Sequence, residues 1–176
     1  MNIFVVDTDP VIAAQMLCDK HIVKMTLESA QMLSTAHRLI DGQLTYIIKN
    51  QRKVKYWEHP TLDDILYKAA HVKHPCTLWT CESIENYNWH YLHFVTLCNE
   101  YTKRYGKVHK SDTKLRDILK TTPKNIPIKS LTRFALAMPE EYKCESAVKS
   151  YHMYYKMDKA RFAKWDKLNN IPKWWK

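Results

Sequence analysis

The first quarter of the chain carries apolar residues three and four positions apart, the spacing of one face of a helix. This pattern predicts a helix over residues 11–40, with a break near residues 18–19. Asp9 and Pro10 stand directly before it, and this pair suits the cap and the first position of a helix. The Asp-Gly pair at residues 41–42 is typical of a helix end.

The same spacing predicts a second long helix over residues 78–105, closed by Gly106 at the position of a C-terminal cap. Shorter helices are predicted over residues 111–120 and 145–165. Residues 121–139 contain prolines and no clear period, so we expect an irregular connector there.

Three other stretches are less regular. Residues 2–6 suit a short strand or a buried extended arm, and residues 44–48 are rich in β-prone side chains. A short helix is expected to begin at Pro60 and to run to about Ala70.

Glycine occurs only twice in the 176 residues. β-Sandwiches and barrels need many tight turns, and glycine adopts their positive φ angles most easily. We therefore predict an all-α fold. It is a single compact domain over residues 1–176 with three main helices and several short ones, and an N-terminal extended segment is left open.

The net charge of the chain indicates which kind of partner it binds. Lysine and arginine number 28 against 18 acidic residues, which gives a formal net charge of +10. Such a surface attracts polyanions, nucleic acid before anionic membranes. The basic residues alternate with aromatic ones, a pattern that favours nucleic acid because rings stack on bases.

The five cysteines indicate a reducing compartment, since their number is odd and none forms a C-x-x-C pair. The N-terminal apolar run stops at Asp7, and no stretch has the roughly 18 apolar residues of a membrane span. We expect a cytoplasmic protein with no membrane partner, located in the host-cell cytoplasm if a phage encodes it.

One face of the first long helix carries a candidate acid–base group. His21, Lys24, Glu28 and Gln31 follow one another at spacings of three and four. A glutamate can take or give a proton, and a nearby cation holds it ionised. The competing interpretation is a solvated face with an ordinary Glu–Lys pair.

A second cluster, His71, His74 and Cys76, contains metal-ligating types. Its spacing straddles a proline turn and no fourth ligand stands out, so we predict no metal and no cofactor. A metal-dependent hydrolase using these histidines with a carboxylate stays as an alternative.

The C-terminal third alternates aromatic rings with cations. Rings of this kind stack on bases while cations follow phosphates; the same rings also suit the core face of a helix. Trp174 and Trp175 are expected either to dock on the body or to stay exposed for a ligand. The candidate nucleic-acid contacts in this region are Arg161, Lys164, Lys173, Trp174 and Trp175.

Several motifs resemble the phage pyrimidine-dimer DNA glycosylases and, more closely, a group of uncharacterised phage proteins. The run Asp-Lys-His-Ile at residues 19–22, followed by Glu28, resembles the family signature that precedes its catalytic glutamate. Further similar segments follow in order: His74–Trp79, Lys103–Gly106, Met157–Arg161 and Ile171–Trp175. Residues 43–70 read as an insertion relative to that family.

The resemblance implies a DNA N-glycosylase with abasic-site lyase activity and no cofactor. In that family the N-terminal amine attacks the deoxyribose C1′ and forms a Schiff base, which permits strand cleavage. Here the amine would be that of Met1, with Lys24 as the substitute, and Glu28 would be the catalytic carboxylate. An α-amine ordinarily has a pKa of about 8, against about 10.4 for lysine, so it is the better nucleophile.

The resemblance further implies that His21 tunes Glu28 or contacts phosphate and that His74 lines the site. Asp19, Lys20 and Gln31 would contact the nucleic acid.

The chain also departs from the family pattern. The family exposes a small N-terminal residue after removal of the initiator methionine, whereas Asn2 is bulky, so we expect Met1 to remain. The arginines that the family places beside its catalytic glutamate match Leu27 and Gln31 here. The resemblance therefore does not carry over dimer recognition in particular, and a different damaged or modified base, or another N-glycosidic substrate, is open. We expect double-stranded DNA with a damaged or modified base as the partner and a monomer as the oligomeric state. The rival function is non-catalytic nucleic-acid binding on the same scaffold.

Overall fold

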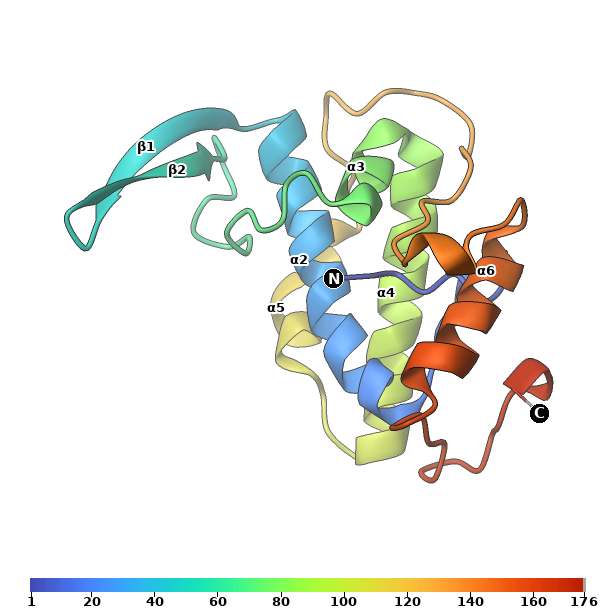
Figure 1. Ribbon diagram of the computed structural model, residues 1–176. Coiled ribbons are helices and arrows are strands. Elements are labelled where there is room, and N and C mark those ends of the chain that lie inside the picture. The colour runs from blue at the N-terminus through green and yellow to red at the C-terminus, as the bar shows by residue number, and fades with distance from the viewer. Residues whose placement is uncertain (176) are drawn as a thin grey trace.

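The computed structural model describes residues 1–175 of the chain. Two helices of 22 residues, α2 and α4, lie side by side at the centre, and the shorter helices pack around them (Figure 1). The elements in chain order are α1 (Pro10–Gln15), α2 (Asp19–Ile40), β1 (Gln43–Lys49), β2 (Arg52–Glu58), α3 (Pro75–Glu82), α4 (Ile84–Tyr105), α5 (Lys110–Leu119), a 3₁₀ turn (Glu140–Tyr142), α6 (Ala147–Tyr154), a π turn (Tyr155–Lys159) and a 3₁₀ turn (Lys173–Trp175). No helix among these described residues is long and apolar enough to cross a membrane.

The predicted break in the first helix and its start are confirmed. Asp9 caps α1 by accepting the backbone N–H groups of Val11 and Ile12, and α2 begins at Asp19. Gly106 ends α4 with a φ of 66°, as expected for a left-handed cap. The predicted helix over 78–105 is interrupted at Ser83, whose hydroxyl caps a new helix by accepting the Asn86 N–H.

The prediction of an all-α fold is wrong, because residues 43–58 form an antiparallel β-hairpin. Its strands carry β-branched and aromatic side chains at alternating positions. Asn50 and Gln51 connect them with positive φ angles of 49° and 61°, as a tight hairpin turn requires. The fold is a helical domain from which a two-stranded ribbon projects (Figure 1).

The expected helix over residues 60–70 is also wrong; the chain there forms turns. Arg38, 1% exposed, explains this difference. Its guanidinium donates to the carbonyl oxygens of Asp63, Leu66 and Tyr67, groups that a helix would use for its own hydrogen bonds. The same guanidinium binds the Asp63 carboxylate and the Trp57 carbonyl, which fastens the hairpin to α2.

The junction between α2 and the hairpin is tight. A Cβ atom at Gly42 would lie 2.4 Å from the Arg38 carbonyl oxygen and 2.7 Å from that of Glu58. Both are backbone atoms, so this position accepts only glycine. The close packing at Gly42 therefore fixes where the hairpin begins relative to the end of α2.

Residues 2–6 form an extended arm that is buried in the core, so the second of the two predicted alternatives holds. Ile3, Phe4, Val5 and Val6 are all less than 5% exposed and join the same apolar cluster as Tyr151. The chain consequently begins near the middle of the molecule in the view of Figure 1, against α2.

Replacing Arg38 by alanine is expected to lower the free energy of unfolding by about 3 to 5 kcal/mol, because Asp63 would lose its buried partner. Arg38→Lys should restore little, since an ammonium cannot fork to several carbonyls. Urea denaturation measures the loss, and limited proteolysis within residues 43–70 should accelerate. The exposed Arg52→Ala serves as control; equal stability of the two alanine variants would contradict this role of Arg38.

Candidate active site

Glu28 lies in the middle of α2 with its side chain 13% exposed, so it is recessed yet reachable from solvent. Its two carboxylate oxygens face different amines. Oε2 accepts the backbone N–H of Asn2 at 3.0 Å and lies 3.7 Å from the α-amine of Met1. Oε1 lies 3.6 Å from Nζ of Lys24, one helical turn earlier. The structure thus brings three of the predicted catalytic residues together.

The Asn2 side chain anchors the arm that delivers the Met1 amine. Its amide nitrogen donates to the Ala137 carbonyl at 2.7 Å, and its oxygen accepts the Phe4 N–H at 3.0 Å. The side chain of Met1 is itself only 3% exposed. Phe4 adopts a φ of 56°, a strained value for an aromatic residue, and burial of its ring supports that conformation.

His74 stands next to this group. It caps α3 by accepting the Cys76 N–H on Nδ1 at 3.2 Å. Burial lowers its pKa first and the positive charge of the Met1 amine lowers it further, while Glu28 acts in the opposite direction. Burial raises the pKa of the Cys76 thiol to about 11, so this cysteine stays protonated at neutral pH.

His21, predicted as a catalytic neighbour of Glu28, lies in the core instead. It is 4% exposed, its ring stacks on Phe4 at 4.4 Å, and its Nδ1 shares a 2.7 Å hydrogen bond with the Tyr155 hydroxyl. Burial, followed by the charges of Lys159 and Lys24, lowers its pKa to about 3. His21 is therefore a neutral residue, and its ring supports the N-terminal arm by packing against Phe4.

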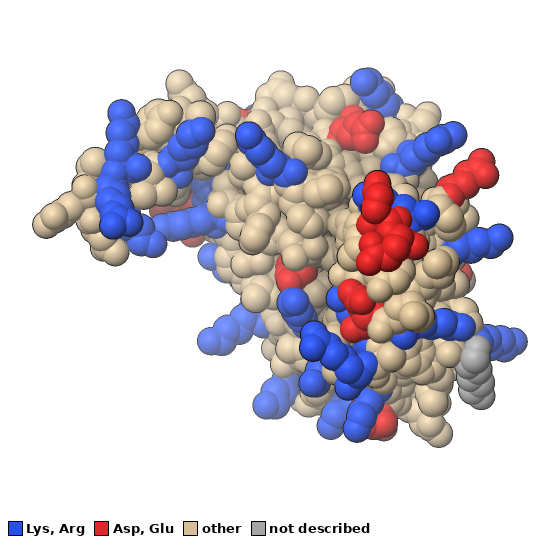
Figure 2. All heavy atoms as spheres, in the orientation of Figure 1, with Lys and Arg blue, Asp and Glu red and all other residues tan. Residues whose placement is uncertain are grey.

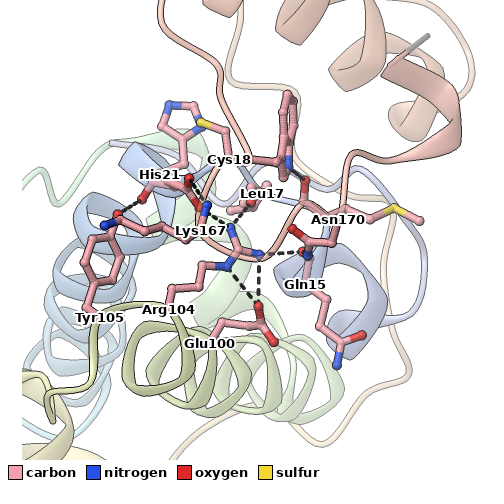
Figure 3. Close-up of polar contacts among 12 residues, drawn as sticks. Gln15, Leu17, Cys18, His21, Glu100, Arg104, Tyr105, Lys167 and Asn170 are labelled. Atoms are coloured by element: carbon pink, nitrogen blue, oxygen red, sulfur yellow. Dashed lines mark hydrogen bonds and ion pairs between the residues drawn. The ribbon is translucent and has the colours of Figure 1, made fainter.

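Asp19 is also removed from solvent, in a buried ion-pair network (Figure 3). Arg104, with a side chain 0% exposed, donates to the Asp19 carboxylate at 3.1 Å and pairs with Glu100 at 2.9 Å. The other Asp19 oxygen accepts the Lys167 N–H at 3.1 Å. Asp19 thereby ties α2, α4 and the C-terminal segment together, a structural role that its position in the motif does not reveal.

The remaining predicted nucleic-acid contacts are spread over the surface. Lys20 is exposed with its ammonium 5.6 Å from the Phe162 ring, and Arg161 lies 6.0 Å from the same ring. Gln31 is half-buried one turn after Glu28. Lys164 and Lys173 are exposed.

The C-terminal tryptophans dock on the body, one of the two alternatives. Trp174 stacks on His152 at 4.2 Å, and its indole N–H donates to the sulfur of Met16 at 3.2 Å. Trp175 packs against Trp165 at 5.0 Å. Both stay partly exposed.

The candidate metal cluster does not assemble. His71 is exposed, His74 uses Nδ1 as a helix cap, and the sulfur of Cys76 faces the Asn2 side chain. Within residues 1–175, the grouping of donor atoms close enough to hold a metal ion is a different one, formed by His37, Asp41 and His59.

The chemistry of that grouping does not fit a metal. Nδ1 of His59 accepts the backbone N–H groups of Thr61 and Leu62, so its buried Nε2 carries the hydrogen and offers no lone pair. The Asp41 carboxylate already accepts the backbone N–H groups of Lys124 and Asn125.

The group that sequence reasoning missed is the backbone N–H of Asn2, the donor closest to Glu28 in distance. A main-chain donor carries no residue-type signal. The only available sign was the apolar run after it, which predicted that the arm would be buried.

Charge is unevenly distributed over the face that shows the chain start. Figure 2 shows Lys and Arg side chains along the hairpin and over the lower part of this face, whereas Asp and Glu side chains gather beside α6. A polyanion would be attracted to the hairpin side and the lower side of this face.

Stability should fall in acid because of His21. Between pH 6.5 and pH 4 the unfolded chain gains a proton that the buried ring, with a pKa of about 3, does not take up. The loss attributable to this ring at pH 4.5 is roughly 2 to 3 kcal/mol. Urea denaturation across this range should show a shallower pH dependence for His21→Phe than for the native chain. Parallel curves would contradict a buried neutral His21.

A family model for pyrimidine dimer DNA glycosylases matches residues 1–114, the segment that contains the N-terminal arm, Glu28 and α4. No curated protein and no solved structure matches the chain. The matched segment is well over half of the 176 residues. The chain therefore belongs to the pyrimidine dimer DNA glycosylase family.

Proposed function

We propose that this protein is a DNA N-glycosylase with abasic-site lyase activity that works through an amine Schiff base. The observation that carries the proposal is the distance of 3.7 Å between the Met1 α-amine and the Glu28 carboxylate. These groups are far apart in the sequence, and the buried arm brings them together beside a recessed surface. The proposal takes Met1 as the first residue of the mature chain.

The chemistry needs one amine and one proton-transferring group. The uncharged amine attacks the deoxyribose C1′, the new C–N bond replaces the glycosidic bond, and the base leaves with a proton. Ring opening gives an imine, and loss of a C2′ proton expels the 3′ phosphate. Water then hydrolyses the imine and frees the amine.

Glu28 is suited to moving the protons of these steps. One of its oxygens faces the attacking amine, and its side chain is 13% exposed, so a sugar that reacts with that amine comes within its range. Lys24 provides a cation on the other oxygen. Its side chain is 65% exposed, so it can also turn toward a phosphate or replace Met1 as the nucleophile.

The chain departs from the family's sequence pattern at two positions beside Glu28. The two positions where the family carries phosphate-gripping arginines are Leu27, which is 40% exposed, and Gln31. Neither holds a positive charge. We propose double-stranded DNA with a damaged or modified base, rather than a pyrimidine dimer, as the substrate, and a monomer as the active form.

Borohydride should trap a covalent adduct between the native chain and duplex DNA that contains an abasic site. Glu28→Gln should slow strand cleavage roughly 100-fold or more while DNA affinity is retained, because the amide cannot accept a proton. The exposed Glu141→Gln is the matched control and should cleave normally. If no adduct forms with any abasic or lesion-bearing duplex, the protein is a binding module without lyase chemistry.

The attacking amine can be identified separately. A Gly-Ser extension before Met1 should abolish trapping, because it removes the α-amine from Glu28, whereas Lys24→Ala should retain it. Mass mapping of the adduct should locate it at Met1, and the intact mass establishes the first residue. Should the cell remove Met1, the nitrogen of Asn2, 3.0 Å from Glu28, becomes the amine in its place. An adduct on Lys24 would overturn the assignment.

A further inference from the structure

The hairpin β1–β2 presents an uncovered face of mixed apolar and basic character. Leu44, Tyr46 and Ile48 follow one another on β1 with exposed fractions of 43%, 53% and 73%. Their partners across the ladder are Trp57, Lys55 and Lys53. The Lys53 ammonium lies 4.5 Å from the centre of the Tyr46 ring.

On the opposite face, Tyr56 contacts the body of the domain. Its hydroxyl donates to the Asp63 carboxylate at 2.5 Å, and Lys68 lies over its ring. Tyr56 therefore helps to hold the ribbon, while Leu44, Tyr46 and Ile48 on the other face stay exposed. The turn adds two amide side chains, Asn50 and Gln51, both exposed.

The charge of the hairpin is almost entirely positive. Lys49, Arg52, Lys53 and Lys55 face a single acidic residue, Glu58. Lys53 and Lys55, which share the face of Tyr46, can contact phosphates while the Tyr46 ring faces sugars or bases. Four cations on sixteen residues fit DNA, the polyanion named in the description of this family.

The geometry of the ribbon suits a groove. Strands of seven residues extend about 23 Å, and a two-stranded ribbon fits the major groove of B-form DNA. Arg38, at the root of the hairpin, lies ten positions after Glu28 on α2, which corresponds to about 15 Å along the helix. This is the length of about four base pairs. If the duplex runs along α2, the ribbon would contact it more than about four base pairs from the nucleotide at Glu28.

We propose that the hairpin is a second DNA-binding arm that grips the duplex flanking the target nucleotide, about half a turn to one turn away from it. The proposal rests on the DNA substrate of the proposed function. Arg38 and Gly42 fix the arm to the helix that carries Glu28, so binding of the flank sets the register of the target nucleotide at the Met1 amine.

The test compares the native chain with the double variant Lys53→Gln, Lys55→Gln, which removes the two cations on the face of Tyr46, on two abasic duplexes. One has about 15 flanking base pairs on each side, and the other has about four. Loss of two phosphate contacts should weaken binding to the long duplex about five-fold or more and lower the slope of log K against log salt by about 1.8. Affinity for the short duplex, and borohydride trapping on it, should not change.

The matched control removes two exposed lysines outside the hairpin: Lys129→Gln and Lys149→Gln. Equal loss of affinity in both double variants would show that only net charge matters and would overturn the proposal. So would a concentration-dependent dimer that Ile48→Ser abolishes in sedimentation, since the face would then bind a second copy. Failure of the native chain to be trapped on either duplex would refute the lyase chemistry alone, because the flank-dependent affinity is measured independently of it.

Discussion

Burial of the N-terminal arm is the constraint on which the rest of this structure depends. Five consecutive residues, Asn2 to Val6, are almost inaccessible to solvent, and the hydrophobic effect holds them between α2 and the C-terminal third of the chain. Without that burial the first amine would be the end of a loose chain. With it, the amine lies 3.7 Å from one carboxylate in the middle of a helix, the geometry on which the proposed chemistry depends.

The residues of the Asp-Lys-His-Ile motif and Glu28 have two separate tasks in this structure. Glu28 lies beside the Met1 amine, whereas Asp19 and His21 support the fold through Arg104, the C-terminal segment and Tyr155. Residues within three turns of one helix therefore serve different purposes according to the direction in which they point. The C-terminal segment takes part in this support, because Lys167 bonds Asp19 and Trp165 bonds the Met16 carbonyl.

Helical periodicity and capping residues were sufficient to predict α1, α2, α5 and the end of α4 from the sequence, because those signals are local. The hairpin was missed although residues 44–48 were recognised as β-prone, since a two-stranded ribbon gains much of its stability from its attachment, here Arg38. Spacing and resemblance selected Glu28, Met1 and Lys24 as candidates, whereas the burial of Asp19 and His21 depends on partners more than 80 residues away, which no local pattern reveals.

Burial of the arm has a consequence for the order of folding. The Asn2 side chain donates to the carbonyl of Ala137, and Phe4 packs against Tyr151 and Tyr155, so the arm acquires its partners only when the C-terminal third has folded. Contacts of such long sequence separation form late and slowly. Helices α1 to α5 can therefore form while the Met1 amine is not yet held beside Glu28.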